Sequence, residues 1–380
     1  MKSLKKINAF LLLFILNITD LAVFGSKMLK LEDNKELENF SRLFYWISLF
    51  SSQVFYTLFS KIETAVVAPV TEGSRITNLI LKEVYLLDKE KYFTNTLVCI
   101  GISTLIYGIL SLFLTQFVCL FRKIPRVFYY GVFLWLGLLQ FQAAKALLID
   151  NTHFFVIFLI STLIYCLQYK YETQSFAFMF ALFCSLAVNF IKLIYKIPKE
   201  KFVKNGIFIS DIKIFDGFTF LNQHFDYKHI DFKLIWQLKK KILLLSFFCA
   251  FNILLNFFTF ENYSKLSLCL KKEFLAHSIT NFFCSFGMFP SCFVCSYSTI
   301  LFENNVNEQK DRHVLGLVYF CMIFVINKFF QLVPLHIQAL FPVLVGWSII
   351  HEAYNDIKKT KFTVKLFCFF TAGFLFFLTY

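Results

Sequence analysis

Apolar residues along this chain gather into long runs that short polar breaks separate. The runs lie near residues 8–29, 43–59, 62–72, 94–120, 127–149, 153–168, 175–195, 241–260, 272–285, 286–302, 314–332, 335–352 and 364–380. A helix that spans a bilayer needs about 20 largely apolar residues, and many of these runs are long enough once short polar breaks are allowed. The pattern predicts an all-α polytopic membrane protein with about thirteen spanning segments.

A lysine-rich stretch at residues 196–239, which we expect to be a polar loop, separates the first seven runs from the last six. This layout is typical of inverted-repeat transporters, which place the substrate site where the repeats meet. The third run of each group is short and broken, at 62–72 by Pro69 and at 286–302 by Gly287 and Pro290. We expect the break at Gly287 and Pro290 to start a half-helix at residues 291–302 inside the membrane, because half-helices that end there present free N–H groups to a ligand. We therefore expect these two segments to face each other near the bilayer midplane and to form a transport site.

Composition agrees with a membrane protein, because 58% of the residues are hydrophobic, 55 of 380 are Phe and only 16% are charged. These values exclude a water-soluble globular protein. The net charge of +14 comes mostly from lysines in the polar breaks, where it suits loops near anionic headgroups. No basic stripe with interleaved aromatics lies outside the apolar runs, so the bilayer, and no nucleic acid, is the expected partner.

The N-terminal segment has two possible interpretations, a signal peptide or a first membrane helix. A basic start, an apolar stretch and small residues near Gly25 resemble a signal peptide. Asn17 and Asp20 interrupt that stretch and further spans follow, which favours a first membrane helix.

Several polar residues inside apolar runs are candidates for substrate binding. Asp20 lies deep in the first run, where an ionisable group is costly and usually functional, and Asn17 lies one turn earlier on the same face. The alternative role for Asp20 is to bind the backbone of a neighbouring helix. Ser296 and Ser298 are about 200° apart around a helix, so at most one faces a ligand, and either hydroxyl could instead bond to the carbonyl four residues earlier. Glu63 flanks the third run, whose edge it could simply mark.

Enzymatic and metal chemistry are not expected. The thiols of Cys292 and Cys295 have the spacing of a metal or redox pair, but no second pair accompanies them. His351 and Glu352 lack the second His of a zinc protease helix, and no glycine-rich phosphate loop occurs. A membrane enzyme would need a His/Asp or Ser/His constellation at one membrane face, and the sequence shows none. We expect a non-enzyme without cofactor or metal.

The segment EFLAHSITNFFCSFGMFPSCFVCSYSTILF, which begins at Glu273, resembles the signature of the sulfate permease (SulP) family of anion transporters. Further stretches agree with that family in order and spacing, and look closest to its fungal, vacuolar-type branch. They are Asn17, Asp20 and Gly25 in the first run, SQVFYTLFSKIETAVVAPV, FRKIPRVFYYGVFLWLG, FDYKHIDF and VPLHIQALFPVLVGWSIIHEAYNDIKK.

The resemblance implies secondary transport of sulfate or a similar small anion by alternating access, in a vacuolar or plasma membrane and as a homodimer. It also implies a core domain at residues 1–120 and 240–332 that moves against gate helices at 121–195 and 333–380. The substrate-binding residues expected from the sequence and the resemblance together are Asn17, Asp20, Glu63, Lys145, Ser291, Ser296 and Ser298.

The sequence also departs from the family pattern. Family members have fourteen helices and usually a STAS domain after them, whereas this chain ends after about thirteen predicted helices. An Arg that is frequent in the family falls here at Tyr297 or Thr299, and Lys145 stands where a Glu is common. Lys145 could supply the missing positive charge or reach for the membrane interface. A transporter of a cationic or zwitterionic solute, such as a basic amino acid, and a non-transporting relic of the family therefore stay open.

Overall fold

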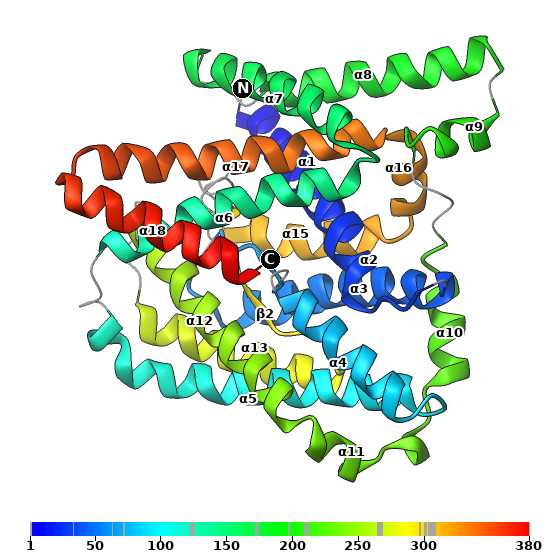
Figure 1. Cartoon of the computed structure of the whole chain (residues 1–380), viewed down its shortest axis with the longest axis vertical. Helices are drawn as coiled ribbons and strands as arrows, with labels where there is room; N and C mark the ends of the chain where they lie inside the picture. The colour runs from blue at the N-terminus through cyan, green and yellow to red at the C-terminus, as the bar shows by residue number, and fades with distance from the viewer. Residues whose placement is uncertain are drawn as a thin grey trace. The chain divides into compact units, whose positions relative to one another are not determined.

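The computed structural model is almost entirely helical and describes most of the chain (Figure 1). The described residues are 2–32, 34–62, 64–70, 73–121, 126–171, 175–196, 198–208, 213–263, 269–295, 298–299, 302 and 309–379. They divide into two compact units. The first comprises residues 1–10, 20–123 and 213–324, and the second comprises residues 11–19, 124–212 and 325–380.

The first unit contains the two short strands and most of the long buried helices. After the C-terminal end of α1 (Lys2–Asp20), its elements are a π-helix (Leu21–Gly25), α2 (Ser26–Met28), α3 (Lys35–Phe59), β1 (Val67–Pro69), α4 (Ser74–Leu87), α5 (Tyr92–Phe121), α10 (Asp216–His224), a 3-10 turn (Tyr227–His229), α11 (Phe232–Gln237), α12 (Lys239–Tyr263), α13 (Leu270–Phe286), β2 (Cys292–Val294) and α15 (Gln309–Met322).

Close helix packing in the first unit depends on glycines of α5. A Cβ atom on Gly101 would lie 3.0 Å from the Ser285 carbonyl oxygen, and one on Gly108 would lie 3.2 Å from the Ser278 carbonyl oxygen, both on α13. The two glycines are seven residues apart and so share one face of α5. Small residues at such a crossing let two helix backbones approach closely, which is the usual mode of helix association in membranes.

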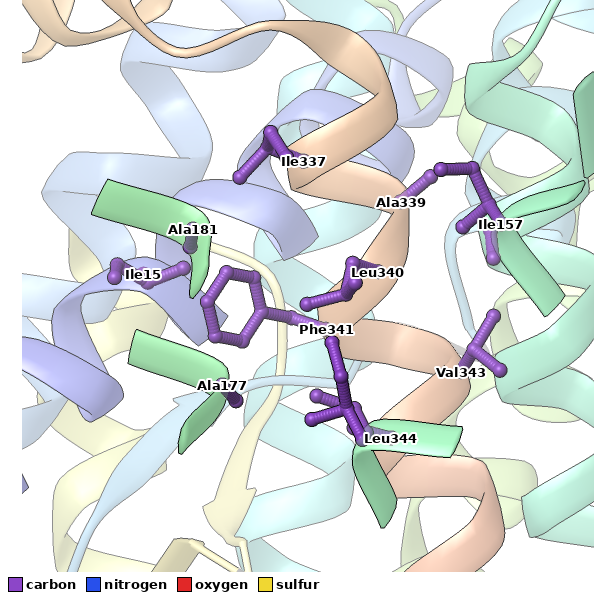
Figure 2. Close-up of a cluster of buried hydrophobic side chains, with 12 residues drawn as sticks. Ile15, Ile157, Ala177, Ala181, Ile337, Ala339, Leu340, Phe341, Val343 and Leu344 are labelled. Carbon is purple, nitrogen blue, oxygen red and sulfur yellow. The ribbon is translucent and has the colours of Figure 1, made fainter. Parts of the chain in front are cut away.

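The second unit is formed by helices. They are α6 (Arg126–Leu147), α7 (Asn151–Tyr171), α8 (Ser175–Ile194), α9 (Lys199–Lys204), α16 (Ile326–Leu332), α17 (Leu335–Lys358) and α18 (Phe362–Thr379). Helices α6 and α17 cross at Gly137 and Gly346, where a Cβ on either residue would lie within 3.0 Å of the other's carbonyl oxygen. An apolar cluster surrounds α17, and Figure 2 shows the Phe341 ring pointing toward Ala177 and Ala181 of α8.

The observed helices differ from the expected membrane spans in number and length. Among the described residues, the helices at Tyr92–Val118 and Asn151–Tyr171 are long and apolar enough to cross a bilayer, and His313–Met322 with Ile326–Leu332 qualifies if taken as one broken span. The sequence predicts about thirteen. Helix α3 is long enough to cross a bilayer but not apolar enough, because polar and charged residues interrupt it, including the buried Arg42 and Gln53. The stretch at 196–239, expected to be a loop, contains α9, α10 and α11.

Candidate functional site

The two broken segments pair with each other through their backbones. Strands β1 and β2 are antiparallel, with Val67 opposite Val294 and Pro69 opposite Cys292. The pairing extends beyond both strands, because the Cys295 N–H donates to the Val66 carbonyl at 2.9 Å and the Val70 N–H donates to the Ser291 carbonyl at 2.8 Å. The expected meeting of the segments around Pro69 and Pro290 is thus confirmed.

The second broken segment begins with a strand. The sequence interpretation started a half-helix at Ser291, but residues 292–294 are extended and the chain is helical at Ser298 and Thr299. That part of the interpretation was wrong. A short, largely apolar run such as the one after Pro290 carries no signal that separates a strand from a helix. The strand forms because it pairs with a segment more than 200 residues away in the chain. Pairing satisfies backbone groups that would otherwise stay unbonded in an apolar medium.

Helix α13 ends in a Schellman-type turn. The Phe289 N–H donates to the Cys284 carbonyl and the Met288 N–H donates to the Ser285 carbonyl, each at 3.0 Å. The residue in the left-handed conformation is Met288, with φ of +58°, and not Gly287. Gly287 is needed for a different reason, because a Cβ atom there would lie 2.5 Å from the Phe289 ring.

A buried glutamine of α3 holds the segment that leads into β1. The Gln53 side-chain oxygen accepts a hydrogen bond from the Val67 N–H at 2.8 Å, and its amide nitrogen donates to the Ala65 carbonyl at 2.9 Å. The same nitrogen lies 3.1 Å from the Thr57 hydroxyl. One side chain thereby satisfies two backbone groups that no helix satisfies.

Two buried residues of α13 hold β2 in a corresponding way. The Asn281 side-chain oxygen accepts from the Cys292 N–H at 2.9 Å, and its nitrogen donates to the Cys292 carbonyl at 3.1 Å. His277 Nε2 accepts from the Val294 N–H at 3.1 Å. Accepting at Nε2 requires an unprotonated nitrogen there, so the neutral imidazole carries its proton on Nδ1. Each strand is thus bound by side chains from the helix that precedes it.

Hydroxyl groups complete the surroundings of the strand pair. The Thr299 hydroxyl accepts from the Val66 N–H at 3.1 Å. The Thr104 hydroxyl of α5 donates to the Phe289 carbonyl at 2.8 Å and lies 3.3 Å from the Ser291 hydroxyl. Ser291 and Thr104 therefore form a small buried polar pair beside β2, next to the apolar side chains of the strands.

Helix α4 starts at Ser74, a few residues after β1 ends at Pro69. The Gly73 N–H donates to the Val70 carbonyl at 3.2 Å, and Gly73 occupies the N-cap position without a side-chain cap. The first turn of a helix presents N–H groups that have no intrahelical acceptor, together with the positive end of the helix dipole. Such an end is a ready binding place for an anion.

The sequence-predicted site residues fall in different places. Ser291 is buried beside the strand pair, and Ser298 is half-buried in the helical turn that follows β2. Asn17 is buried in α1 and donates to the Leu13 carbonyl at 2.9 Å, while Asp20 is half-buried where α1 passes into the π-helix. Lys145 is exposed on α6 of the second unit. Glu63 and Ser296 lie outside the described residues, as does Tyr297.

Sequence reasoning missed the residues that position the strands, and it also missed a role for Glu273. Glu273 is buried on α13 and accepts from the Tyr56 and Ser60 hydroxyls at 2.7 Å each and from the Lys61 N–H at 3.0 Å. It therefore binds the end of α3 to the start of α13. The sequence did contain a signal for these residues, namely polar residues inside the apolar run that precedes each break. Polar residues are costly within a membrane and are therefore rarely there by accident.

Comparison with known proteins shows the fold. No protein-family model and no curated protein matches the sequence. Among solved structures, the chain matches the transmembrane domain of a cyanobacterial bicarbonate transporter, BicA, with a TM-score of 0.59 at 10% identity over 98% of this chain and 96% of that one. The chain has the fold of a transporter's transmembrane domain.

Two structures of a solute carrier family 26 protein agree. The chain matches SLC26A9 with a TM-score of 0.55 at 12% identity, over 96% of this chain and 62% of that chain. It matches the murine SLC26A9 anion transporter in its inward-facing state with a TM-score of 0.54 at 11% identity, over 97% of this chain and 65% of that chain. It spans less than two thirds of the length of these two proteins. The all-α transporter fold with inverted repeats, expected from the two broken segments, is confirmed.

Proposed function

We propose that this protein is a secondary transporter of a small anion, such as sulfate or a similar oxyanion, and belongs to the SulP group of transporters. The observation that carries the proposal is the strand pair, with the N-terminus of α4 a few residues after β1 in the chain, in a fold that bicarbonate and other anion transporters share. Broken backbone inside a membrane domain is tolerated only where it lines a cavity or is buried in protein.

The chemistry of the site suits an anion. The backbone of both strands is bonded to Gln53, Asn281 and His277, so the strands form a fixed support for the helix end that follows. The N-terminus of α4 offers about half a positive charge, and the Ser291 and Ser298 hydroxyls can donate hydrogen bonds. We propose that the two compact units are the bodies that move during alternating access.

Uptake of labelled sulfate and bicarbonate into proteoliposomes tests the proposal. We expect saturable uptake of at least one of them, and reduced uptake in Ser291→Ala. Ser285→Ala is the matched control, because the Ser285 hydroxyl bonds to the Phe282 carbonyl of its own helix. We expect the control to transport like the wild type. Absence of saturable uptake of either anion, or equal effects of both variants, would contradict the proposed site.

A cationic or zwitterionic solute is the second candidate, favoured by one observation. Asp20 places a half-buried carboxyl at the start of a π-helix, and π-helical turns inside helices are frequent at functional sites. A carboxylate near the substrate would attract a cation and repel an anion. Inhibition of labelled-solute uptake in the same proteoliposomes by arginine or lysine, and no inhibition by sulfate, would support this second candidate.

A further inference from the structure

A short segment of the first unit exposes large aromatic side chains among lysines. We call it the α11 surface and define it by Tyr227, Lys228, Phe232, Lys233, Trp236, Lys239 and Lys240. Tyr227, Phe232 and Trp236 are 73%, 76% and 68% exposed. Phe232 and Trp236 are four residues apart, so they lie on one face of α11. Exposed aromatic side chains gathered in one short segment are the kind of surface that marks an interaction with a membrane or a partner.

The exposure does not arise from a loosely attached loop. On the inner side of the segment, Leu234, Ile235 and Leu238 are buried. Buried Asn95 on α5 accepts from the Asp231 N–H at 2.8 Å and donates to the His229 carbonyl at 3.0 Å. The segment is therefore bound to the first turns of α5, and its aromatic side chains are directed outward by its own fold.

The place of attachment gives the level of this surface relative to a bilayer. Asn95 lies in the first turns of the apolar helix Tyr92–Val118, which is long enough to cross a membrane. Helix α12 begins at Lys239, and its lysines precede another long apolar run. We infer that both helices enter the apolar layer close to α11. Tyr and Trp are enriched at that level in membrane proteins, where lysines reach the headgroups.

The net charge on the segment is positive, although one of its lysines, Lys241, is paired with Glu83 of α4. Residues 226–241 contain five lysines and two aspartates. Oδ1 of each aspartate accepts backbone N–H groups, Asp226 from Lys228 and Asp231 from Lys233, both at 2.9 Å. The Lys239 ammonium lies 4.2 Å from the centre of the Trp236 ring, a cation–π contact that puts a positive charge directly over the aromatic group.

We propose that the α11 surface binds the headgroups of anionic phospholipids in the membrane that holds the protein. Phe232 and Trp236 enter the boundary between headgroups and acyl chains, and Lys233, Lys239 and Lys240 contact the lipid phosphates and carboxylates. This site is separate from the strand pair and does not depend on which solute is transported.

Quenching of Trp236 fluorescence tests the proposal. The full chain is placed in nanodiscs with the same mole fraction of either brominated phosphatidylserine or brominated phosphatidylcholine, and the signal of Trp236 is the difference between wild type and Trp236→Phe. We expect both lipids to quench Trp236, with phosphatidylserine stronger by roughly twofold or more, because each lysine near the surface attracts anionic lipid. The excess quenching should shrink at 1 M salt, because the Debye length there is only about 3 Å and attraction between charges farther apart is largely screened.

Two lysine variants complete the test. We expect the combined variant Lys233→Gln, Lys239→Gln and Lys240→Gln to lose the excess quenching by phosphatidylserine. The matched control is Lys358→Gln, Lys359→Gln and Lys361→Gln, three exposed lysines of the second unit, which should keep it. Absence of quenching by either lipid would show that Trp236 lies outside the bilayer. Equal quenching by both lipids, or an excess that survives the first variant, would also overturn the proposal.

Discussion

Single amide side chains do much of the positioning in this site. Gln53 and Asn281 each bond to one N–H and one carbonyl of the strand segments, and His277 bonds to a third position. Amide groups suit this task because they donate and accept at once, as a neighbouring strand would. Two three-residue strands have too few bonds of their own to hold a register, so we infer that these side chains fix it.

Removal of the Asn281 amide should therefore destabilise the site. We expect Asn281→Ala to lower the free energy of unfolding by about 1–3 kcal/mol for each of the two Cys292 backbone groups that it leaves unpaired. Thr280→Ala is the matched control, because Thr280 is buried on the same helix but its hydroxyl bonds to the Ala276 carbonyl of that helix. The midpoint of thermal unfolding in detergent measures both. Similar losses in the two variants would refute the positioning role of Asn281.

At the scale of elements, the break after α13 was predictable but its geometry was not. Gly287 and Pro290 mark the end of a helix in the sequence, and the pairing of two broken segments follows from their equivalent places in the two halves. Which residue takes the left-handed conformation depends on contacts that no local pattern encodes. Here the Phe289 ring lies over Gly287, and Met288 takes the positive φ. The amide pairing of Asn281 with Cys292 was equally hidden, because it joins a helix to a strand that the sequence does not predict.

Substitutions in this turn should have opposite effects. Met288→Gly should stabilise the protein by about 1 kcal/mol, because a residue with a Cβ is strained at positive φ. Gly287→Ala should destabilise it by about 1–3 kcal/mol, since the new Cβ would overlap the Phe289 ring. Gly373→Ala in α18 is the control, because a Cβ there meets nothing within 4 Å. The thermal unfolding midpoints of the three variants measure whether Met288→Gly is more stable than the wild type and Gly287→Ala less stable. A destabilised Met288→Gly would contradict the strain argument.

At the scale of the whole molecule, the fold and the proposed function rest on different kinds of evidence. Long apolar runs predict the membrane class, and the two broken segments predict the inverted-repeat transporter fold. The chemistry of the solute is less directly encoded, because an anion site made of helix N-termini and hydroxyls uses backbone groups that every sequence has. The two charged candidates among the described residues, Asp20 and Lys145, belong to different units, Asp20 half-buried and Lys145 exposed.

Ligand-dependent stability of the whole chain separates binding from transport. A solute that binds only the folded state raises its stability by about 2.7 kcal/mol at a concentration one hundred times the dissociation constant. We expect sulfate or bicarbonate, each as its sodium salt, to raise the unfolding midpoint of the purified protein above that in sodium chloride of equal ionic strength. Arginine should not raise it, and Ser291→Ala should reduce the shift while Ser285→Ala should not. A higher unfolding midpoint with an anion, but no saturable uptake in proteoliposomes, would indicate a binding protein that has lost transport. A higher midpoint with arginine alone would contradict the anion site and indicate a cation site around Asp20.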